Sequence, residues 1–141
     1  MFIFQLKDRD LMQPTARRVM IIDDDPDDLE LMELAIRDLD PKSACVTYIY
    51  PEEALKNLLA QDQNLLPQYI FIDINMPGLS GANVLKILRR ESRFDDVIVT
   101  LYSTSMPQPV AEVLRGSGAN HVFEKPVRLE AYSEIIRNIF M

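Results

Sequence analysis

The chain is poor in the residues that build covalent and metal-bound scaffolds. It has one cysteine, one histidine and no tryptophan in 141 residues. A lone thiol cannot form an internal disulfide or supply a cysteine-rich metal site, so a reducing, cytoplasmic setting is expected. Cys45 is expected to be a small apolar residue at the start of a strand. His121 is interpreted as a surface or strand-end imidazole rather than a metal ligand or phosphodonor.

Long apolar runs and an excess of basic charge are also missing. No apolar run approaches the roughly 18 residues that a membrane helix needs. The short apolar patch at residues 1–4 has no basic segment before it, so a signal peptide is not expected. Lys and Arg number 15 against 22 Asp and Glu, which gives a net charge of -7. Such an acidic chain is not expected to bind nucleic acid or an anionic membrane surface.

What the sequence does contain is a regular alternation of strand and helix patterns. Residues 1–17 match neither period and are interpreted as an N-terminal extension of unknown role. After them, apolar runs alternate with helical patterns through residues 18–141, which are expected to form one domain. The runs lie at about 19–23, 44–50, 69–73, 97–101 and 120–124. Strict alternation predicts an α/β fold with a five-stranded parallel sheet, helices on both faces and right-handed crossovers.

Acidic residues stand at the ends of two of these runs. Asp73 ends the run 69–73 and is followed by the turn-forming pair Pro77-Gly78. The first run ends in the cluster Asp23-Asp24-Asp25. Because ligands of such sheets bind beyond the carboxyl ends of the strands, these acids are expected to share one cation. A set of oxygen ligands, few in number, suits Mg²⁺ better than Ca²⁺.

A hydroxyl and an ammonium group follow two further strands. Ser103 comes after the fourth run, and Lys125 comes directly after the fifth. A cation bound by the acids, together with the ammonium of Lys125, would neutralise charge on the oxygens of a phosphoryl group. Ser103 can donate its hydroxyl to another of those oxygens. The four strand ends therefore predict a phosphoryl-binding site.

From about Val19 onward the chain resembles the receiver domain of two-component response regulators, a flavodoxin-like family that includes the chemotaxis response regulator. The family's acidic pair matches Asp23 and Asp24, and its phosphoacceptor matches Asp73. Its hydroxyl residue matches Ser103, and its Lys-Pro pair matches Lys125-Pro126. Both offsets from Asp73 are those expected of the family. Each match is weak alone, but all of them in order on the right elements are specific.

The resemblance implies a doubly wound sheet with strand order 2-1-3-4-5 and a site that holds Mg²⁺. The ion would bind the carboxylates of Asp24 and Asp73 and the main-chain carbonyl of Asn75, with Asp23 reaching it through water. Lys125 would contact the phosphoryl group. Its peptide bond to Pro126 is expected to be cis.

The resemblance also implies partners and an output. Asp73 would accept a phosphoryl group from a sensor histidine kinase or a histidine phosphotransfer protein. Ser103 would then move toward it and bias a surface around the fourth helix, fifth strand and fifth helix. That surface is a candidate homodimer face. Because the sequence stops soon after the last helical pattern, a single-domain regulator that signals by protein contact is expected.

Two positions depart from the family pattern. An aromatic residue usually stands three positions before the lysine, but here Val122 does, with Phe123 beside it. An aromatic relay through that position is therefore not expected. The residue after the hydroxyl is often alanine or glycine, but here it is the bulkier Thr104.

Thr104 leads to a first testable prediction. If its side chain narrows the approach to Asp73, Thr104→Ala should speed phosphorylation by small donors such as acetyl phosphate. The rate of phosphorylation at fixed donor concentration measures this. Unchanged or slower kinetics would refute the steric role.

Simpler interpretations remain open for some of these residues. Asp24 or Asp25 can act as the cap of the first helix, with Pro26 at its first position. Asp27 and Asp28 are assigned to the helix macrodipole rather than to the metal. Ser103 can be a solvated loop hydroxyl.

Functions from other classes fit less well. A phosphatase of the haloacid dehalogenase type needs a second aspartate two residues after the first, where Asn75 stands. A flavin-binding module needs a phosphate loop after the first strand, where three acids would repel a phosphate. The serious alternative is a pseudo-receiver, an interaction module that is never phosphorylated. Mg²⁺-dependent labelling of Asp73 separates it from a true receiver.

Overall fold

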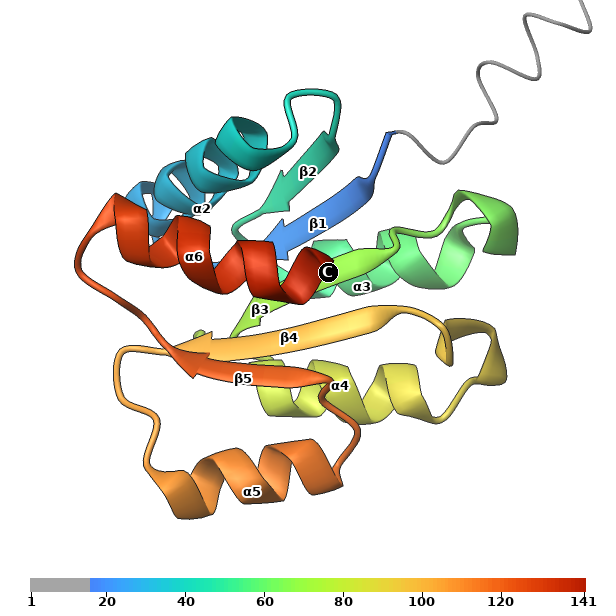
Figure 1. Cartoon of the computed structure of the whole chain (residues 1–141). Coiled ribbons are helices and arrows are strands. Elements are labelled where there is room, and N and C mark those ends of the chain that lie inside the picture. The colour runs from blue at the N-terminus through green and yellow to red at the C-terminus, as the bar shows by residue number, and fades with distance from the viewer. Residues whose placement is uncertain (1–15) are drawn as a thin grey trace, which may run out of the picture.

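The protein is seen in a computed structural model that describes residues 16–141. The predicted N-terminal extension therefore lies almost entirely outside the described residues. Five parallel strands form one sheet in the order β2-β1-β3-β4-β5 (Figure 1). The strands are β1 (Arg18–Ile22), β2 (Ala44–Tyr48), β3 (Tyr69–Asp73), β4 (Ile98–Ser103) and β5 (His121–Glu124). The predicted fold class and strand order are confirmed.

Helices cover both faces of the sheet. They are α2 (Pro26–Leu39), α3 (Pro51–Ala60), α4 (Gly81–Arg89), α5 (Gln108–Gly116) and α6 (Leu129–Phe140), with short 3₁₀ turns η1 (Gln63–Leu65) and η2 (Ser92–Phe94). Buried residues of α2 and α6 pack in one cluster, and those of α3, α4 and α5 pack in the other. Among residues 16–141, no helix has the length and apolar character that a membrane crossing requires.

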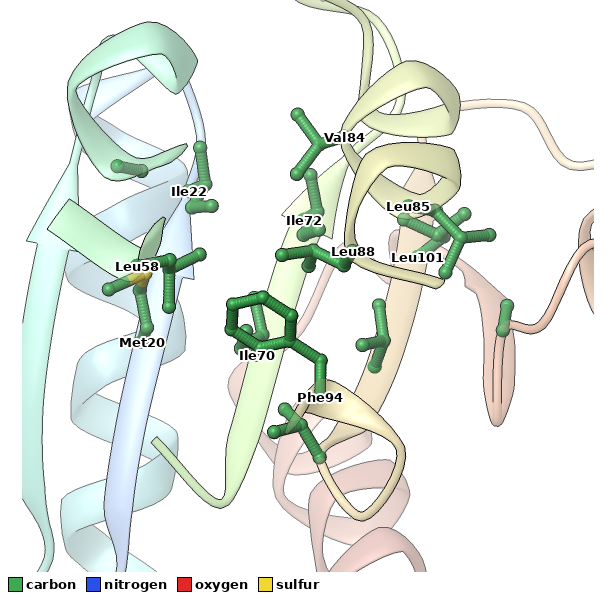
Figure 2. Close-up of a cluster of buried hydrophobic side chains, with 14 of the residues drawn as sticks. Met20, Ile22, Leu58, Ile70, Ile72, Val84, Leu85, Leu88, Phe94 and Leu101 are labelled. Carbon is green, nitrogen blue, oxygen red and sulfur yellow. The ribbon is translucent and has the colours of Figure 1, made fainter. Parts of the chain in front are cut away.

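The central strand shows why the sheet forms where it does. Ile70 and Ile72 of β3 pack under α3 and α4, and Phe71 between them packs toward α2 and α6. All three side chains are fully buried. Figure 2 shows Ile70 and Ile72 beside Leu88 and Phe94. A continuous apolar run is what a parallel strand covered on both faces requires.

The first helix begins as its sequence predicts. Pro26 occupies the first turn of α2, and the Asp25 side chain caps it by accepting a hydrogen bond from the backbone N–H of Asp27 at 3.0 Å. The capping role falls to Asp25. Asp23 and Asp24 are thus left at the end of β1.

One local expectation agrees with the structure and one is wrong. Cys45 lies at the start of β2, as its second residue, and is half-buried because β2 is an edge strand with several exposed positions. The expected cis bond before Pro126 is wrong, since the described residues contain no cis peptide bond. A proline alone leaves the trans form favoured, and nothing local in the Lys-Pro pair reverses that preference.

Candidate functional site

The strand order brings the predicted site residues to one edge of the sheet. β1 pairs with β3, so the chain leaves Ile22 and Ile72 side by side toward Asp23 and Asp73. β3 pairs with β4, and β4 pairs with β5, whose last residue precedes Lys125. The strand order reverses between β1 and β3. Ligands of open α/β sheets bind at such a point.

Lys125 is surrounded by carboxylates. Its ammonium lies 2.7 Å from an oxygen of Asp28 and 3.3 Å from oxygens of Asp23 and Asp73. Its side chain is 9% exposed. Burial alone would lower the pKa of Lys125, but the three carboxylates more than offset it and raise the pKa. The amine is therefore held as a buried cation beside Asp73.

Asp28 was missed as a site residue. Its assignment to the helix macrodipole is incomplete, because its carboxylate makes the shortest contact of the Lys125 ammonium. It lies in the first turn of α2, and that helix begins at the edge of the sheet where the strands end. An acid in the first turn of the helix after β1 is the sequence feature that could have identified it.

The acids at this edge form a compact cluster. One carboxylate oxygen from each of Asp23, Asp24 and Asp73 lies within 4.8 Å of the other two. Asp23 and Asp73 are buried, whereas Asp24 is exposed. Burial, and then the charge of Asp23, raise the pKa of Asp73 to about 6, although Lys125 and the backbone N–H of Asn75 act in the opposite direction. Burial also raises the pKa of Asp23.

This donor set fits a hard divalent cation. Three carboxylates at such distances repel one another, and a cation relieves the repulsion that raises the pKa of Asp73. All the donors are oxygens, as Mg²⁺ prefers, and the exposed Asp24 leaves an opening for retained water. Asp24 and Asp73 would hold the ion directly, and Asp23 would reach it through water. No contact of the structure bears on the main-chain carbonyl of Asn75, whose role as a ligand remains a prediction.

Ser103 joins the site through Asn75. The Asn75 side-chain amide donates to the Ser103 hydroxyl at 2.8 Å, and the backbone N–H of Asn75 donates to Asp73 at 3.2 Å. Ser103 is buried as the last residue of β4, so it is not the solvated loop hydroxyl considered above. The hydroxyl is tied to the loop that carries Asp73. Its role toward a phosphoryl group remains a prediction.

Aromatic residues behind the acids were also missed. The Tyr102 hydroxyl donates to an oxygen of Asp23 at 3.0 Å, and the Tyr102 ring stacks on that of Phe123. Val122 packs on the other face of the sheet, with the cluster under α3, α4 and α5. In the sequence, Tyr102 reads as one more apolar residue of a buried strand. Only a buried phenol's need for a partner could have pointed to it.

Gly81 allows the loop after β3 to pass close to α4. A Cβ built on Gly81 would lie 2.5 Å from the carbonyl oxygen of Asp73 and 3.0 Å from the Ile74 Cα. Both are backbone atoms, so neither can move aside cheaply. The absence of a side chain at this position therefore helps to set where Asp73 ends its strand.

Gly81→Ala is expected to lower the free energy of unfolding by about 1–3 kcal/mol through this overlap. Urea denaturation at fixed pH measures it. Gly116→Ala is the matched control, because a Cβ there meets nothing within 4 Å. That control should be neutral or stabilising, since alanine favours a helix over glycine. Equal stability of the two variants would contradict the close approach at Gly81.

Known proteins give an independent comparison. The family profile described as the response regulator receiver domain matches residues 19–137. Stress response regulator protein 1 of Candida tropicalis is 27% identical over 113 residues, which cover 80% of this chain and 41% of that protein. The chain spans about two fifths of the length of the first curated relatives it matches.

Solved structures show the same fold at low identity. The phosphorylated cyanobacterial phytochrome response regulator RcpA has a TM-score of 0.77 and 20% identity, covering 88% of this chain and 91% of that one. The Mn²⁺-bound form of response regulator Rcp1 has a TM-score of 0.75 and 17% identity, covering 87% and 91%. The profile match over most of the chain shows the family, and these structures agree with it in fold. The protein belongs to the response regulator receiver domain family.

Proposed function

We propose that this chain accepts a phosphoryl group on Asp73 from a sensor histidine kinase or a histidine phosphotransfer protein. The observation that carries the proposal is the ammonium of Lys125, 3.3 Å from the Asp73 carboxylate within a cluster of three further acids. A buried cation beside a buried carboxylate is placed to neutralise the negative charge of a phosphoryl group that the carboxylate accepts. Residues 18–141 form the receiver unit in this proposal.

The transfer needs one nucleophile and several groups that neutralise charge. One oxygen of Asp73 attacks the phosphorus of the donor's phosphohistidine. The new phosphorus–oxygen bond forms as the phosphorus–nitrogen bond breaks, and the electron pair of the broken bond stays on the imidazole nitrogen. Bound Mg²⁺ would supply positive charge to the phosphoryl oxygens. Asp24, Asp73 and the Asn75 carbonyl would hold it, and Asp23 would reach it through water.

Lys125 and Ser103 act on the phosphoryl oxygens. The Lys125 ammonium already lies at the Asp73 oxygen, so it can contact the new group with little movement. Ser103 accepts a hydrogen bond from the Asn75 amide, so its own hydroxyl proton stays available for a phosphoryl oxygen. A movement of Ser103 toward that oxygen would link phosphorylation to the loop after β4. Receiver domains are signalling phosphoacceptors rather than enzymes with a separate substrate, and turnover is limited here to the chain's own phosphoryl group.

The output is proposed to be protein contact, including a homodimer through α5, β5 and α6. Support comes from apolar side chains that stand exposed there: Val113 of α5 is 67% exposed, and Val127, between β5 and α6, is 95% exposed. Exposed apolar groups near a switching loop suit a contact surface. No nucleic-acid or membrane partner is proposed, because the net charge is -7. A cytoplasmic location remains a prediction.

Intact mass spectrometry tests the phosphoacceptor directly. The wild-type chain, incubated with acetyl phosphate and Mg²⁺, is expected to gain the mass of one phosphoryl group, and EDTA should prevent the gain. Asp73→Asn should gain nothing. Asp96→Asn, at an exposed turn, is the matched control and should label like the wild type. A wild-type chain that never labels would support the pseudo-receiver alternative instead.

A further inference from the structure

Among the described residues, Tyr102 is the one tyrosine whose hydroxyl donates a hydrogen bond to the acid cluster. Tyr102 lies in β4, two strands away from β1, and its side chain is fully buried. Its hydroxyl donates to the Oδ2 of Asp23 at 3.0 Å. The Asp23 side chain is itself fully buried. The Tyr102 side chain therefore reaches from β4 across β3, the strand that carries Asp73, to the Asp23 carboxylate.

The Asp23 carboxylate has contacts on both of its oxygens. Its Oδ1 accepts the backbone N–H of Asp25 at 3.0 Å. Its Oδ2 accepts Tyr102 and also lies 3.3 Å from the ammonium of Lys125. A carboxylate offers about four lone-pair positions, two on each oxygen. Contacts to both oxygens hold Asp23 in one orientation, and that orientation determines where a metal-bound water is received.

The ring of Tyr102 is held as firmly as its hydroxyl. Phe123 stacks on it with centroids 5.3 Å apart and planes 10° apart. Tyr132 of α6 meets Phe123 edge-on, with centroids 6.4 Å apart and planes at 86°. The Lys125 ammonium lies 5.3 Å from the centroid of the Tyr102 ring. The phenol therefore loses little freedom when the site is filled.

We propose that Tyr102 is a positioning residue for the metal site, whose hydroxyl fixes the Asp23 carboxylate in the orientation that receives the ion. The inference rests on the proposed function for the identity of the ion, Mg²⁺. Without the hydroxyl, Oδ2 of Asp23 keeps only its contact with Lys125, and the orientation of the carboxylate is less firmly fixed, although Oδ1 still accepts the backbone N–H of Asp25. Groups that orient the ligands of a metal control its affinity without touching it.

Tyr102→Phe removes the hydroxyl and keeps the ring and its stack on Phe123. Isothermal titration of the metal-free chain with MgCl₂, with no phosphodonor present, is expected to show about tenfold weaker binding. The Mg²⁺ concentration for half-maximal phosphorylation should rise by the same factor, while the rate at saturating Mg²⁺ stays near the wild-type rate. A purely structural role would lower the melting temperature and leave the Mg²⁺ affinity unchanged.

Tyr69→Phe is the matched control. Tyr69 begins β3 at the opposite end of the sheet, and its ring packs on Phe140. That variant should bind Mg²⁺ like the wild type. A second test uses Asp23→Ala, which leaves the Tyr102 hydroxyl no side-chain acceptor at position 23; in that background Tyr102→Phe should weaken Mg²⁺ binding no further, because the two residues act as a unit.

The outcomes separate this inference from the proposed function. If the wild type binds Mg²⁺ and Tyr102→Phe binds it equally well, Tyr102 has no positioning role, although phosphorylation of Asp73 can still occur. Additive losses in the double variant would also overturn the inference, since they would mean that Tyr102 acts elsewhere than on Asp23. A wild type that binds no Mg²⁺ would overturn both.

Discussion

Lys125→Met is expected to slow phosphorylation of the chain by about 100-fold at saturating Mg²⁺ and donor, the usual cost of losing one group that stabilises developing charge. Methionine keeps the length and packing of the stem but has no ammonium. The acids now neutralised by contacts of 2.7 and 3.3 Å would face one another without a cation. The single-turnover rate, followed by intact mass, measures the loss.

The free energy of unfolding of Lys125→Met should also be lower than that of the wild type at a pH at which the clustered acids are ionised. Removing the ammonium takes away the charge that now lowers the pKa of Asp73, so that pKa should rise further above about 6. Lys86→Met, at an exposed position of α4, is the control for charge and side-chain type. A Lys125→Met chain with the rate of this control would mean that Lys125 does not act on the phosphoryl group.

Asp73→Asn is expected to raise the free energy of unfolding by about 3 kcal/mol at pH 7.5 in EDTA, as a pKa raised from 3.8 to about 6 implies. The fold raises the pKa of Asp73 from 3.8 to about 6, so ionised Asp73 destabilises the folded state above that pH. As the pH falls through 6, the folded state takes up a proton before the unfolded state does. The wild type therefore regains this free energy between about pH 6 and pH 4.

Urea denaturation of wild type and variant at pH 7.5 and pH 4.5 measures the difference. The stabilisation by Asp73→Asn should be largest at pH 7.5 and much smaller at pH 4.5. Added Mg²⁺ should stabilise the wild type and narrow the gap at pH 7.5, because the ion binds the folded state. Asp96→Asn should show none of this pattern. A variant less stable than the wild type at pH 7.5 would contradict the buried, repelled state of Asp73.

The sheet could be predicted from the sequence because its strands are short, apolar and regularly spaced. The run 69–73 is buried on both faces, which its continuous apolar character predicts. The edge strand β2 gives a weaker signal, since several of its residues are exposed and Cys45 is only half-buried. The burial of an edge strand depends on its having a neighbouring strand on one side only, and the local sequence does not show which strand that will be.

Some residues of the site could be predicted from the sequence, and others could not. Asp23, Asp73 and Lys125 could be placed together because each follows a strand, and the carboxyl ends of parallel strands meet. Asp28 and Tyr102 have only weak signals in the sequence, an acid in the first turn of a helix and a phenol in a buried strand, because their contacts depend on how α2 and the Tyr102 side chain lie across the sheet. The peptide bond before Pro126 was predicted wrongly, because the motif that suggested a cis bond does not fix the isomer.

The position of the phosphoryl group in the labelled chain tests the central claim most directly. Borohydride reduction of an acyl phosphate converts the aspartate that carried it to homoserine, and peptide mass spectrometry then locates the change. We predict homoserine at position 73 alone, formed only when Mg²⁺ was present during labelling. Phosphorylation at His121, Ser103 or any other residue, with Asp73 unmodified, would contradict the account.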